Sequence, residues 1–333
     1  MPAINKDNFI KVVTNIKQEI RTTQVKTMQQ VNGNLIMMYF RIGRILYENS
    51  MNDLAFMRKV SLELKLEFSD LKGFSERNLY NMREFYEAYK DERFLQQLVA
   101  KISWSHNLLL LSKIKDRKVR EFYMRATIEN GWSRNVLAMQ IESGYHQRIG
   151  KGINNFKSAL PPANSDLVNK IMKDPYIFDF LTLKEGHKEK ELERAMIERI
   201  KNVLIELGKG FSFVGNQYKI SMPDGDYYID LLFYHLDLRC YIAIELKATK
   251  FKPEYIGQLG FYVTAVDETL KKANDNQTIG LLLCREKDRL TVNWSLKSSK
   301  VPIGVSEFEL EKYIPKEMLE KLPTKEDLNL HLD

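Results

Sequence analysis

Two acidic residues and one lysine have the types and the spacing best suited to chemistry in this chain. Asp230 lies in a run of alternating apolar residues, 227–234, and a second such run, 240–247, contains Glu245 and Lys247. Alternation with a period of two predicts β-strands, in which residues two apart project from the same face. The short segment between the runs suits a hairpin loop, which would bring Asp230 beside Glu245 and Lys247.

This set of side chains suits metal-assisted hydrolysis of a phosphodiester. Hard divalent cations take oxygen ligands and keep several waters. We therefore expect Asp230 and Glu245 to bind Mg²⁺, with Mn²⁺ as a substitute. Such an ion polarises a phosphoryl oxygen and lowers the pKa of a water, while Lys247 would orient the attacking water or help to deprotonate it, or offset the developing charge. The alternative is an exposed strand face with ordinary charges, but the apolar strand around Glu245 and Lys247 favours function.

The same three residues resemble the PD-(D/E)xK nuclease superfamily. Ile229 stands where the superfamily name has proline, at a position that varies among its members. The resemblance implies a further glutamate on the helix that precedes the strands, which we expect over 188–207. The candidates there are Glu189, Glu191, Glu193 and Glu198. Glu193 is our choice because it lies on the flank of the apolar stripe of this helix, whereas Glu189 precedes the established helix.

Residues after the second site strand complete the expected set. The resemblance implies a glutamine on the following helix, and Gln258 fits that place, on the same helix face as Tyr262. Lys250 and Lys252 lie just past the strand and are candidates for contacts with phosphates.

Residues 1–160 have a mostly helical pattern with two similar helix starts, each with a glycine, a serine cap, and then arginine and asparagine. Arginine and asparagine can read guanine and adenine edges, so a helix-turn-helix is one interpretation. A plain helical hairpin with a solvated polar face is the other. The expected DNA-binding residues of this half are Arg77, Asn78, Arg83, Arg134 and Asn135.

Longer motifs point to one family. The runs GFSERNL, ISWSHN and ENGWSRNVL in the first half, and LGKGFSFVGNQ, YIDLLFYH, IELK and FKPEYIGQ in the second, resemble the bacterial YhcG-type (DUF1016) family. The resemblance implies a helical, winged-helix-like DNA-binding domain followed by a PD-(D/E)xK domain.

Charge and composition agree with a soluble polyanion-binding enzyme. Residues 1–160 hold 26 Lys and Arg against 16 Asp and Glu, a net +10, and the remainder holds 25 against 28, a net −3. A basic half suits DNA, although a basic surface with no partner is the alternative. We see no membrane-spanning run and no signal peptide, and the two cysteines, Cys240 and Cys284, suit buried thiols of a reducing compartment.

These patterns predict an α+β protein. We expect a helical domain over 1–160, a linker with a short helix over 161–185, an αβββαβ nuclease domain with a central mixed sheet over 186–320, and a polar tail over 321–333. The expected function is a cytoplasmic, Mg²⁺-dependent DNA endonuclease, with association with the nucleoid and formation of a homodimer or higher homo-oligomer as options. The alternatives are a DNA-binding or scaffold protein of a defence or mobile-element system with an inactive or rarely active nuclease fold, and an RNA-directed nuclease.

Overall fold

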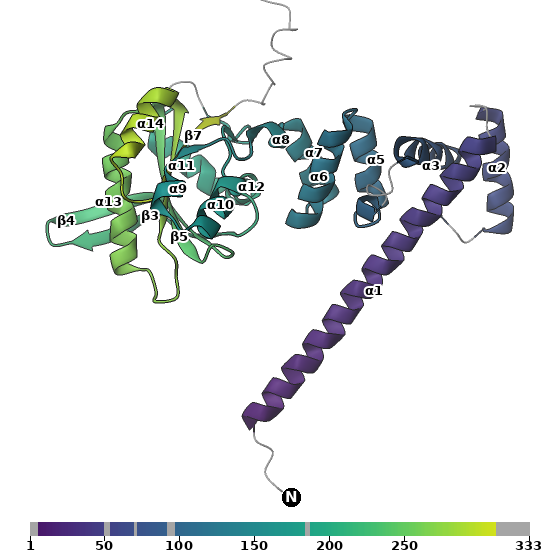
Figure 1. Ribbon diagram of the computed structural model, residues 1–333, viewed down its shortest axis with the longest axis horizontal. Helices are drawn as coiled ribbons and strands as arrows, with labels where there is room; N and C mark the ends of the chain where they lie inside the picture. The colour runs from purple at the N-terminus through teal and green to yellow at the C-terminus, as the bar shows by residue number, and fades with distance from the viewer. Residues whose placement is uncertain (1–5, 50–53, 70–71, 92–96, 184–186, 311–333) are drawn as a thin grey trace, which may run out of the picture. The chain divides into compact units, whose positions relative to one another are not determined.

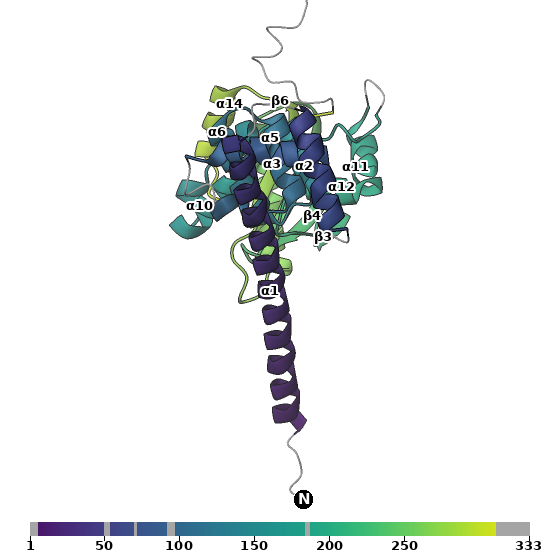
Figure 2. The same ribbon diagram turned by 90° about the vertical axis from the view of Figure 1, so that its right-hand side faces the viewer.

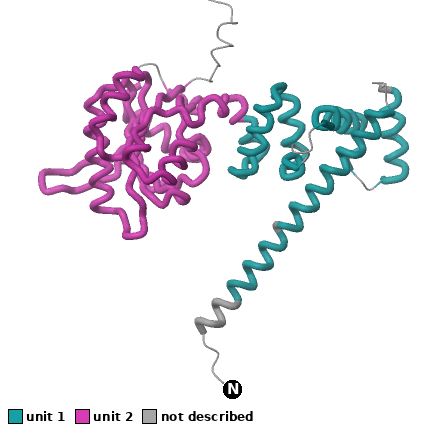
Figure 3. Tube along the Cα trace, viewed as in Figure 1, with its two compact units in different colours: residues 1–138 teal, residues 139–333 magenta. Residues whose placement is uncertain are grey.

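The computed structural model describes residues 6–49, 54–69, 72–91, 97–183 and 187–310. The chain divides into two compact units, residues 1–138 and 139–333 (Figure 3). The predicted polar tail over 321–333, and the end of the nuclease domain at 320, lie outside the described residues.

The described part of the first unit is helical. Figure 2 shows its first helix as one unbroken rod. The helices are α1 (Lys6–Asn49), α2 (Leu54–Glu67), α3 (Glu76–Tyr89), α5 (Trp104–Lys113), α6 (Arg117–Asn130) and α7 (Arg134–Glu142), the last of which crosses into the second unit. No strand occurs among the described residues of 6–138, so no β-hairpin that could form a wing lies among them.

An aromatic cluster holds the helices of the first unit together. The Trp104 ring lies edge-on to Tyr39 and Phe85, with centroid distances of 4.9 and 5.1 Å. Gly43 lets α1 approach α3 closely, because an added Cβ would collide with the carbonyl of Met82. Burial of large aromatic side chains supplies most of the packing energy in such a helical core.

The second unit begins earlier than the predicted domain boundary at residue 160. Its first elements are α8 (Tyr145–Arg148), β1 (Ile153–Asn154) and α9 (Phe156–Ala159). β1 pairs antiparallel with β7 (Ile303–Glu309), and Phe156 is fully buried in the core of this unit. These contacts place the segment in the second unit.

The segment predicted as a linker is also part of this unit. It forms α10 (Pro162–Ile171) and β2 (Tyr176–Ile177), which pairs in parallel with β7. Val168, Met172 and Phe178 are buried in the core. Pro161 and Pro162 stand at the start of α10, where a proline in the first turn loses no hydrogen bond.

A mixed sheet in the order β1-β7-β6-β5-β4-β3 forms the centre of the second unit. Its long strands are β3 (Phe211–Met222), β4 (Gly225–His235), β5 (Cys240–Lys250) and β6 (Ile279–Glu286). β3, β4 and β5 form an antiparallel meander, whereas β5, β6 and β7 run in parallel. With the helices below, these strands give the predicted αβββαβ order.

Helices cover both faces of this sheet (Figure 1). α10, α11 (Glu189–Glu198) and α12 (Ile200–Leu207) pack on the face that contains Phe233, Ile244 and Leu283. α13 (Glu254–Thr269) and α14 (Arg289–Lys297) pack on the opposite face, against Leu232, Ala243 and Cys284. Burial on both faces explains why β6 is a continuous apolar run.

Both cysteines are buried free thiols, as predicted. Burial raises the pKa of each to about 12, so neither is a reactive thiolate. In the described part of the chain, no helix has the length and apolarity that crossing a membrane requires.

Candidate active site

The candidate site lies where β4 and β5 part. Their pairing runs from His235 opposite Cys240 to Leu231 opposite Ile244. At the next position Asp230 Oδ2 accepts a hydrogen bond of 2.9 Å from the backbone N–H of Leu246. The Asp230 side chain thus occupies a place in the strand ladder, which fixes its carboxylate beside β5.

Glu245 and Lys247 project from the same face of β5, as the alternation predicts. Lys247 Nζ donates a 2.8 Å hydrogen bond to Glu245 Oε1. Glu245 is 2% exposed and Lys247 is 7% exposed. The other carboxylate oxygen, Glu245 Oε2, is buried and has no hydrogen-bond partner. A buried anionic oxygen without a partner is costly, so this atom is suited to a cation.

Burial controls the electrostatics of the two carboxyl groups. It raises the pKa of Asp230 to about 6, and the charges of Glu193 and Glu189 add to the rise. It raises the pKa of Glu245 to about 7, where the charge of Asp230 is the next cause. Two carboxyl groups with pKa values this close to neutrality would be fully ionised beside a divalent cation, which favours their charged forms.

The Lys247 ammonium is held in its charged form. Burial alone would lower its pKa, but the hydrogen bond and the charge of Glu245 outweigh that effect, and the pKa is raised. Its Nζ lies 3.7 Å from Glu189 Oε2 and 5.0 Å from the centre of the Tyr255 ring. Lys247 is therefore a fixed cation and not a neutral amine.

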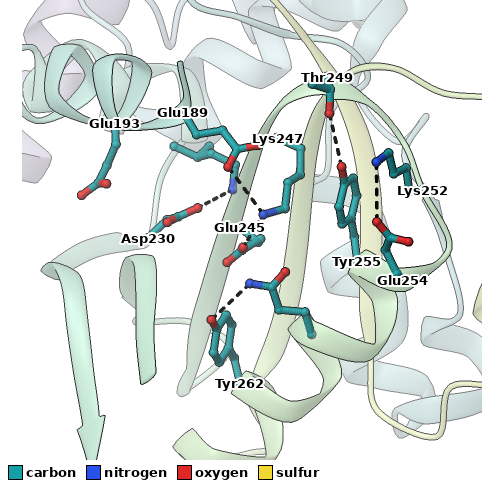
Figure 4. A network of polar contacts seen from close by, with 12 residues as sticks. Glu189, Glu193, Asp230, Glu245, Lys247, Thr249, Lys252, Glu254, Tyr255 and Tyr262 are labelled. Carbon is teal, nitrogen blue, oxygen red and sulfur yellow. Dashed lines mark hydrogen bonds and ion pairs between the residues drawn. The ribbon is translucent and has the colours of Figure 1, made fainter. Parts of the chain in front are cut away.

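Figure 4 shows two helix glutamates near this group, Glu189 and Glu193. Glu189 is the first residue of α11 and points toward Lys247. Glu193, the predicted choice, is buried, and its carboxylate accepts hydrogen bonds from Asn216 Nδ2 at 3.0 Å and Gln217 Nε2 at 2.7 Å. The structure therefore brings both glutamates to the site, in different surroundings.

Gln217 is a site residue that the sequence did not reveal. The β3–β4 register places it opposite Asp230, and its Nε2 also donates to Asp230 Oδ1 at 3.1 Å. Its backbone φ is +43°, a left-handed conformation that is strained for a residue with a side chain. The signal available in the sequence was a polar pair, Asn216-Gln217, inside a strand, which is an unfavourable place for asparagine.

The residues expected after β5 lie around the site. Gln258 Nε2 donates to the Tyr262 hydroxyl at 3.2 Å, which confirms their shared helix face. Burial raises the pKa of Tyr262, and the charges of Glu245 and Asp230 contribute. Lys250 is exposed at the end of β5, and Lys252 is exposed and lies 3.6 Å from Glu254.

The structure gives two of the predicted base-reading residues an internal role. The Asn78 amide donates to the carbonyl of Gly73 and accepts a 2.8 Å hydrogen bond from Trp104 Nε1. The Arg83 side chain is 11% exposed, with its guanidinium 5.5 Å from the Tyr47 ring centre. Both side chains are used to hold helices together, so they are poorly placed to read bases.

The other three residues of that prediction are exposed. Arg77, Arg134 and Asn135 lie on the surface of the first unit. Arg77 and Arg134 line one hollow of about 550 Å³ together with Asn81. One residue from each of the two similar helix starts therefore lines the same hollow. The helix-turn-helix interpretation stays a prediction.

A metal at this site would be held by few protein ligands. No group of three or more His, Cys, Asp and Glu side chains with metal-binding geometry occurs within the described ranges. Mg²⁺ usually takes one or two carboxylates and completes its shell with water and substrate oxygens. Asp230 and Glu245, with the partnerless Oε2 of the latter, fit that donor set.

Known proteins match along most of the chain. Residues 15–148 match the DUF1016 N-terminal domain, and residues 169–323 match the YhcG PDDEXK nuclease domain. A protein of Escherichia coli (strain K12) named "Putative nuclease YhcG" is 26% identical, and the alignment covers 88% of each chain.

Two solved structures resemble part of the chain. One is a repair endonuclease from Pyrococcus abyssi, with 16% identity, a TM-score of 0.26, and coverage of 40% of this chain and 50% of that one. The other is the EndoMS-dsDNA2 complex, with 19% identity, a TM-score of 0.28, and coverage of 40% and 48%. The chain thus spans about half the length of each of these structures.

The two domain matches follow one another in the order that the motifs indicate. The first lies mostly in the helical first unit, and the second covers most of the sheet of the second unit. The chain therefore belongs to the YhcG-type (DUF1016) family and carries its PD-(D/E)xK nuclease domain.

Proposed function

We propose that this protein is a metal-dependent endonuclease that hydrolyses DNA phosphodiester bonds. The observation that carries the proposal is the buried Glu245 Oε2 with no partner, beside Asp230 and the Lys247 ammonium. Such an arrangement is unfavourable for a fold and useful for a site that receives a cation and a phosphate.

Asp230 and Glu245 would hold the ion, Mg²⁺ or in its place Mn²⁺. When bound, a divalent ion polarises a phosphoryl oxygen and stabilises the charge that develops in the transition state. The Leu246 N–H and the Gln217 amide hold the Asp230 carboxylate from two sides, at 2.9 and 3.1 Å. The protein therefore supplies a preorganised pair of anionic ligands.

Lys247 would act as a cation. Its raised pKa keeps the ammonium protonated at neutral pH, so it offsets charge on the phosphate or orients the attacking water by donating hydrogen bonds. Glu189 Oε2 lies 3.7 Å from Lys247 Nζ, so Glu189 and Glu245 share that ammonium. Glu189 would accept a hydrogen bond or a proton from a water that Lys247 orients. Gln258, held by Tyr262, would contact the scissile region.

DNA is the expected substrate because the exposed cations gather in the first half of the chain. Arg77 and Arg134 line one hollow in the first unit, and Lys250 and Lys252 are exposed beside the site in the second. Arginine and lysine contacts to phosphates supply most of the non-specific affinity for nucleic acids. These exposed side chains are therefore our proposed DNA contacts.

Incubation of the full chain with supercoiled plasmid, single-stranded DNA and RNA, each with Mg²⁺ or with EDTA, tests the proposal. We expect cleavage of DNA that requires the divalent ion, and a loss of about a hundredfold or more in Asp230→Asn and Glu245→Gln, because one ligand of the ion is lost. Asp226→Asn is the matched control, since it lies on the same strand but pairs with Lys219 at 2.7 Å on the surface.

Three outcomes would contradict the proposal. Cleavage that persists in Asp230→Asn or Glu245→Gln would reject the site. Binding without cleavage under every divalent ion would favour a DNA-binding or scaffold role. Cleavage of RNA in preference to DNA would favour an RNA-directed nuclease.

A further inference from the structure

A large polar hollow lies in the second unit, beside β7 and outside the candidate active site. Its volume is about 760 Å³. We call it the β7 hollow. Its lining includes the polar side chains Asn154, Asn169, Asp174, Lys287 and Asn293, and three exposed cations, Lys151, Lys157 and Arg289, which we call the rim.

The floor of the β7 hollow holds one lysine between two acids. Lys287 Nζ lies 2.6 and 2.7 Å from the two oxygens of Asp174 and 3.8 Å from Glu307 Oε2. Asn154 Nδ2 donates to Asn169 Oδ1 at 2.8 Å. The floor is thus a fixed, hydrogen-bonded surface with one negative charge in excess, which the three cations of the rim outweigh.

The rim is positive. Lys151, Lys157 and Arg289 are exposed, and none of the three has an ion pair among the residues that the structure describes. Three free cations around an amide-bearing hollow favour an anion with several oxygen acceptors, such as the phosphates of a nucleic acid strand.

An exposed aromatic side chain stands beside this rim. α14 lies against β1 and contributes Arg289 and Asn293, one turn apart, to the hollow. On the outer side of the same helix, Trp294 is 64% exposed and Leu290 is 56% exposed. Tryptophan is highly buried on average, so a ring exposed to this extent is unusual. Free cations next to an exposed ring match the way in which proteins bind single-stranded nucleic acid, with phosphates in a basic groove and bases on aromatic faces.

The β7 hollow opens at the same end of the sheet as the candidate active site. Lys247 on β5, Cys284 on β6 and Glu307 on β7 are register partners in adjacent parallel strands. Glu307 lines the hollow. With strands about 4.8 Å apart, the backbones of Lys247 and Glu307 lie about 10 Å apart, a distance that the nucleotides next to a bond held at the site can span.

We propose that the β7 hollow and Trp294 bind a single-stranded segment of DNA next to the bond that is cut. The rim cations hold its phosphates, and a base stacks on the Trp294 ring. The role as a substrate subsite rests on the proposed nuclease function, whereas the binding itself does not.

The test measures binding in a chain that is not expected to cleave. Full-length protein with Asp230→Asn is titrated with fluorescent 12-nucleotide single strands and with the matching duplex, and anisotropy is followed over a range of salt concentrations. The triple variant Lys151→Ala, Lys157→Ala, Arg289→Ala is compared with a control triple, Lys201→Ala, Lys209→Ala, Lys272→Ala, made of exposed lysines of the same unit outside the hollow. We expect the rim triple to bind the single strand at least about tenfold more weakly, with a log–log salt slope reduced by about 2, because about 0.7 is lost per phosphate contact.

Trp294 is tested separately. We expect Trp294→Ala to weaken single-strand binding by about fivefold or more and duplex binding by less than about twofold, and Trp294→Phe to restore most of the loss, because stacking needs only an aromatic face. Leu290→Ala, an exposed apolar side chain on the same helix, should leave both affinities unchanged.

Each result decides the question. Equal losses in the rim and control triples, unchanged binding in the rim triple, or tighter hollow-dependent binding of RNA than of DNA would overturn the inference. If binding depends on the hollow but the wild-type chain cleaves nothing with any divalent ion, the proposed function is contradicted. The hollow is then a single-strand binding site without a role in cleavage.

Discussion

Two buried clusters of three charged side chains in the second unit are near mirror images. The candidate active site joins two acids and one base, Asp230, Glu245 and Lys247. The second cluster joins two bases and one acid, Arg148, Lys173 and Glu206, each at most 5% exposed. Burial acts on both, yet only one of them has the features of a site.

We call the second cluster the complete cluster because both oxygens of its carboxylate have partners, although Lys173 Nζ is ion-paired at 3.7 Å and makes no hydrogen bond. Glu206 Oε1 accepts from Arg148 at 2.6 Å and from the Ile177 N–H at 3.0 Å, and its Oε2 lies 3.7 Å from Lys173 Nζ. Arg148 also donates to the carbonyls of Ser143 and Pro175. Both oxygens of the Glu206 carboxylate therefore have partners, and the cluster connects the start of the second unit to α12.

In the candidate active site the carboxylates are left in excess. One Lys247 ammonium serves Glu245 and Glu189, and Glu245 Oε2 has no partner. The comparison teaches that buried charge alone does not mark function. A carboxylate oxygen that the fold buries without a partner, beside a second carboxylate, is the feature that distinguishes the candidate site, because leaving a buried charge uncompensated is costly.

The largest expected effect is on the complete cluster. Glu206→Gln should lower the free energy of unfolding by about 3 to 5 kcal/mol, because it leaves Arg148 and Lys173 buried without a counter-charge. Urea denaturation followed by circular dichroism measures this. Glu198→Gln, a surface glutamate 64% exposed, should change stability by less than about 0.5 kcal/mol. A loss below about 1 kcal/mol in Glu206→Gln would mean that the two clusters do not differ as we describe.

The candidate active site should respond to pH in a way that the complete cluster does not. The pKa values of Asp230 and Glu245 are raised to about 6 and about 7. Between about pH 4 and 7 the folded protein therefore holds protons that the unfolded chain has released, so metal-free stability falls as pH rises. Denaturation at several pH values in EDTA measures this. The double variant Asp230→Asn, Glu245→Gln should flatten the curve, and a wild-type curve that rises over this range would contradict it.

The complete cluster should give the opposite sign at higher pH. Burial lowers the pKa of Lys173 to about 8. Between about pH 8 and 10.5 the folded chain loses that proton while the unfolded chain keeps it, so this group contributes stability that grows with pH, by about 3 kcal/mol. The difference in unfolding free energy between wild type and Lys173→Met, measured from pH 7 to 10.5, reports it. A constant difference would show that Lys173 does not titrate in this window.

Divalent ions should stabilise the protein through the candidate active site and not through the complete cluster. Mg²⁺ at about ten to a hundred times its dissociation constant should raise the unfolding free energy by about 1.4 to 2.7 kcal/mol. The gain should be smaller at pH 5.5 than at pH 8, because protons on Asp230 and Glu245 compete with the ion. Thermal denaturation with Mg²⁺ or EDTA measures this, and Glu245→Gln should lose the gain. An equal gain in that variant would place the ion elsewhere.

The smallest effect is expected at Gln217. Its amide joins Asp230 to Glu193, so Gln217→Ala should slow cleavage by about two- to fivefold, the equivalent of one neutral hydrogen bond. The acid limb of the pH–rate profile should move to higher pH, because Asp230 loses a donor to its charged form. Asn216→Ala removes a donor to Glu193 only and should leave that limb in place. Identical profiles for the two variants would deny Gln217 a positioning role.

Local patterns of the sequence were sufficient for the strands and for the core of the candidate site. Alternation with a period of two put Glu245 and Lys247 on one face, and the length of the hairpin brought Asp230 to them. Both depend on residues near one another in the chain, where covalent geometry limits the choices. The burial of Cys240 and Cys284, and the helix face shared by Gln258 and Tyr262, were predictable for the same reason.

Only the tertiary structure decided which distant side chains meet. The register of β3 against β4 set Gln217 opposite Asp230, and the approach of α11 brought Glu189 to Lys247. Trp104 donates a hydrogen bond to the Asn78 amide, which the sequence predicted to read a base. Such pairings depend on packing between elements far apart in the chain, which no local period encodes, and so the residues that complete or remove a site were fixed only when the elements came together.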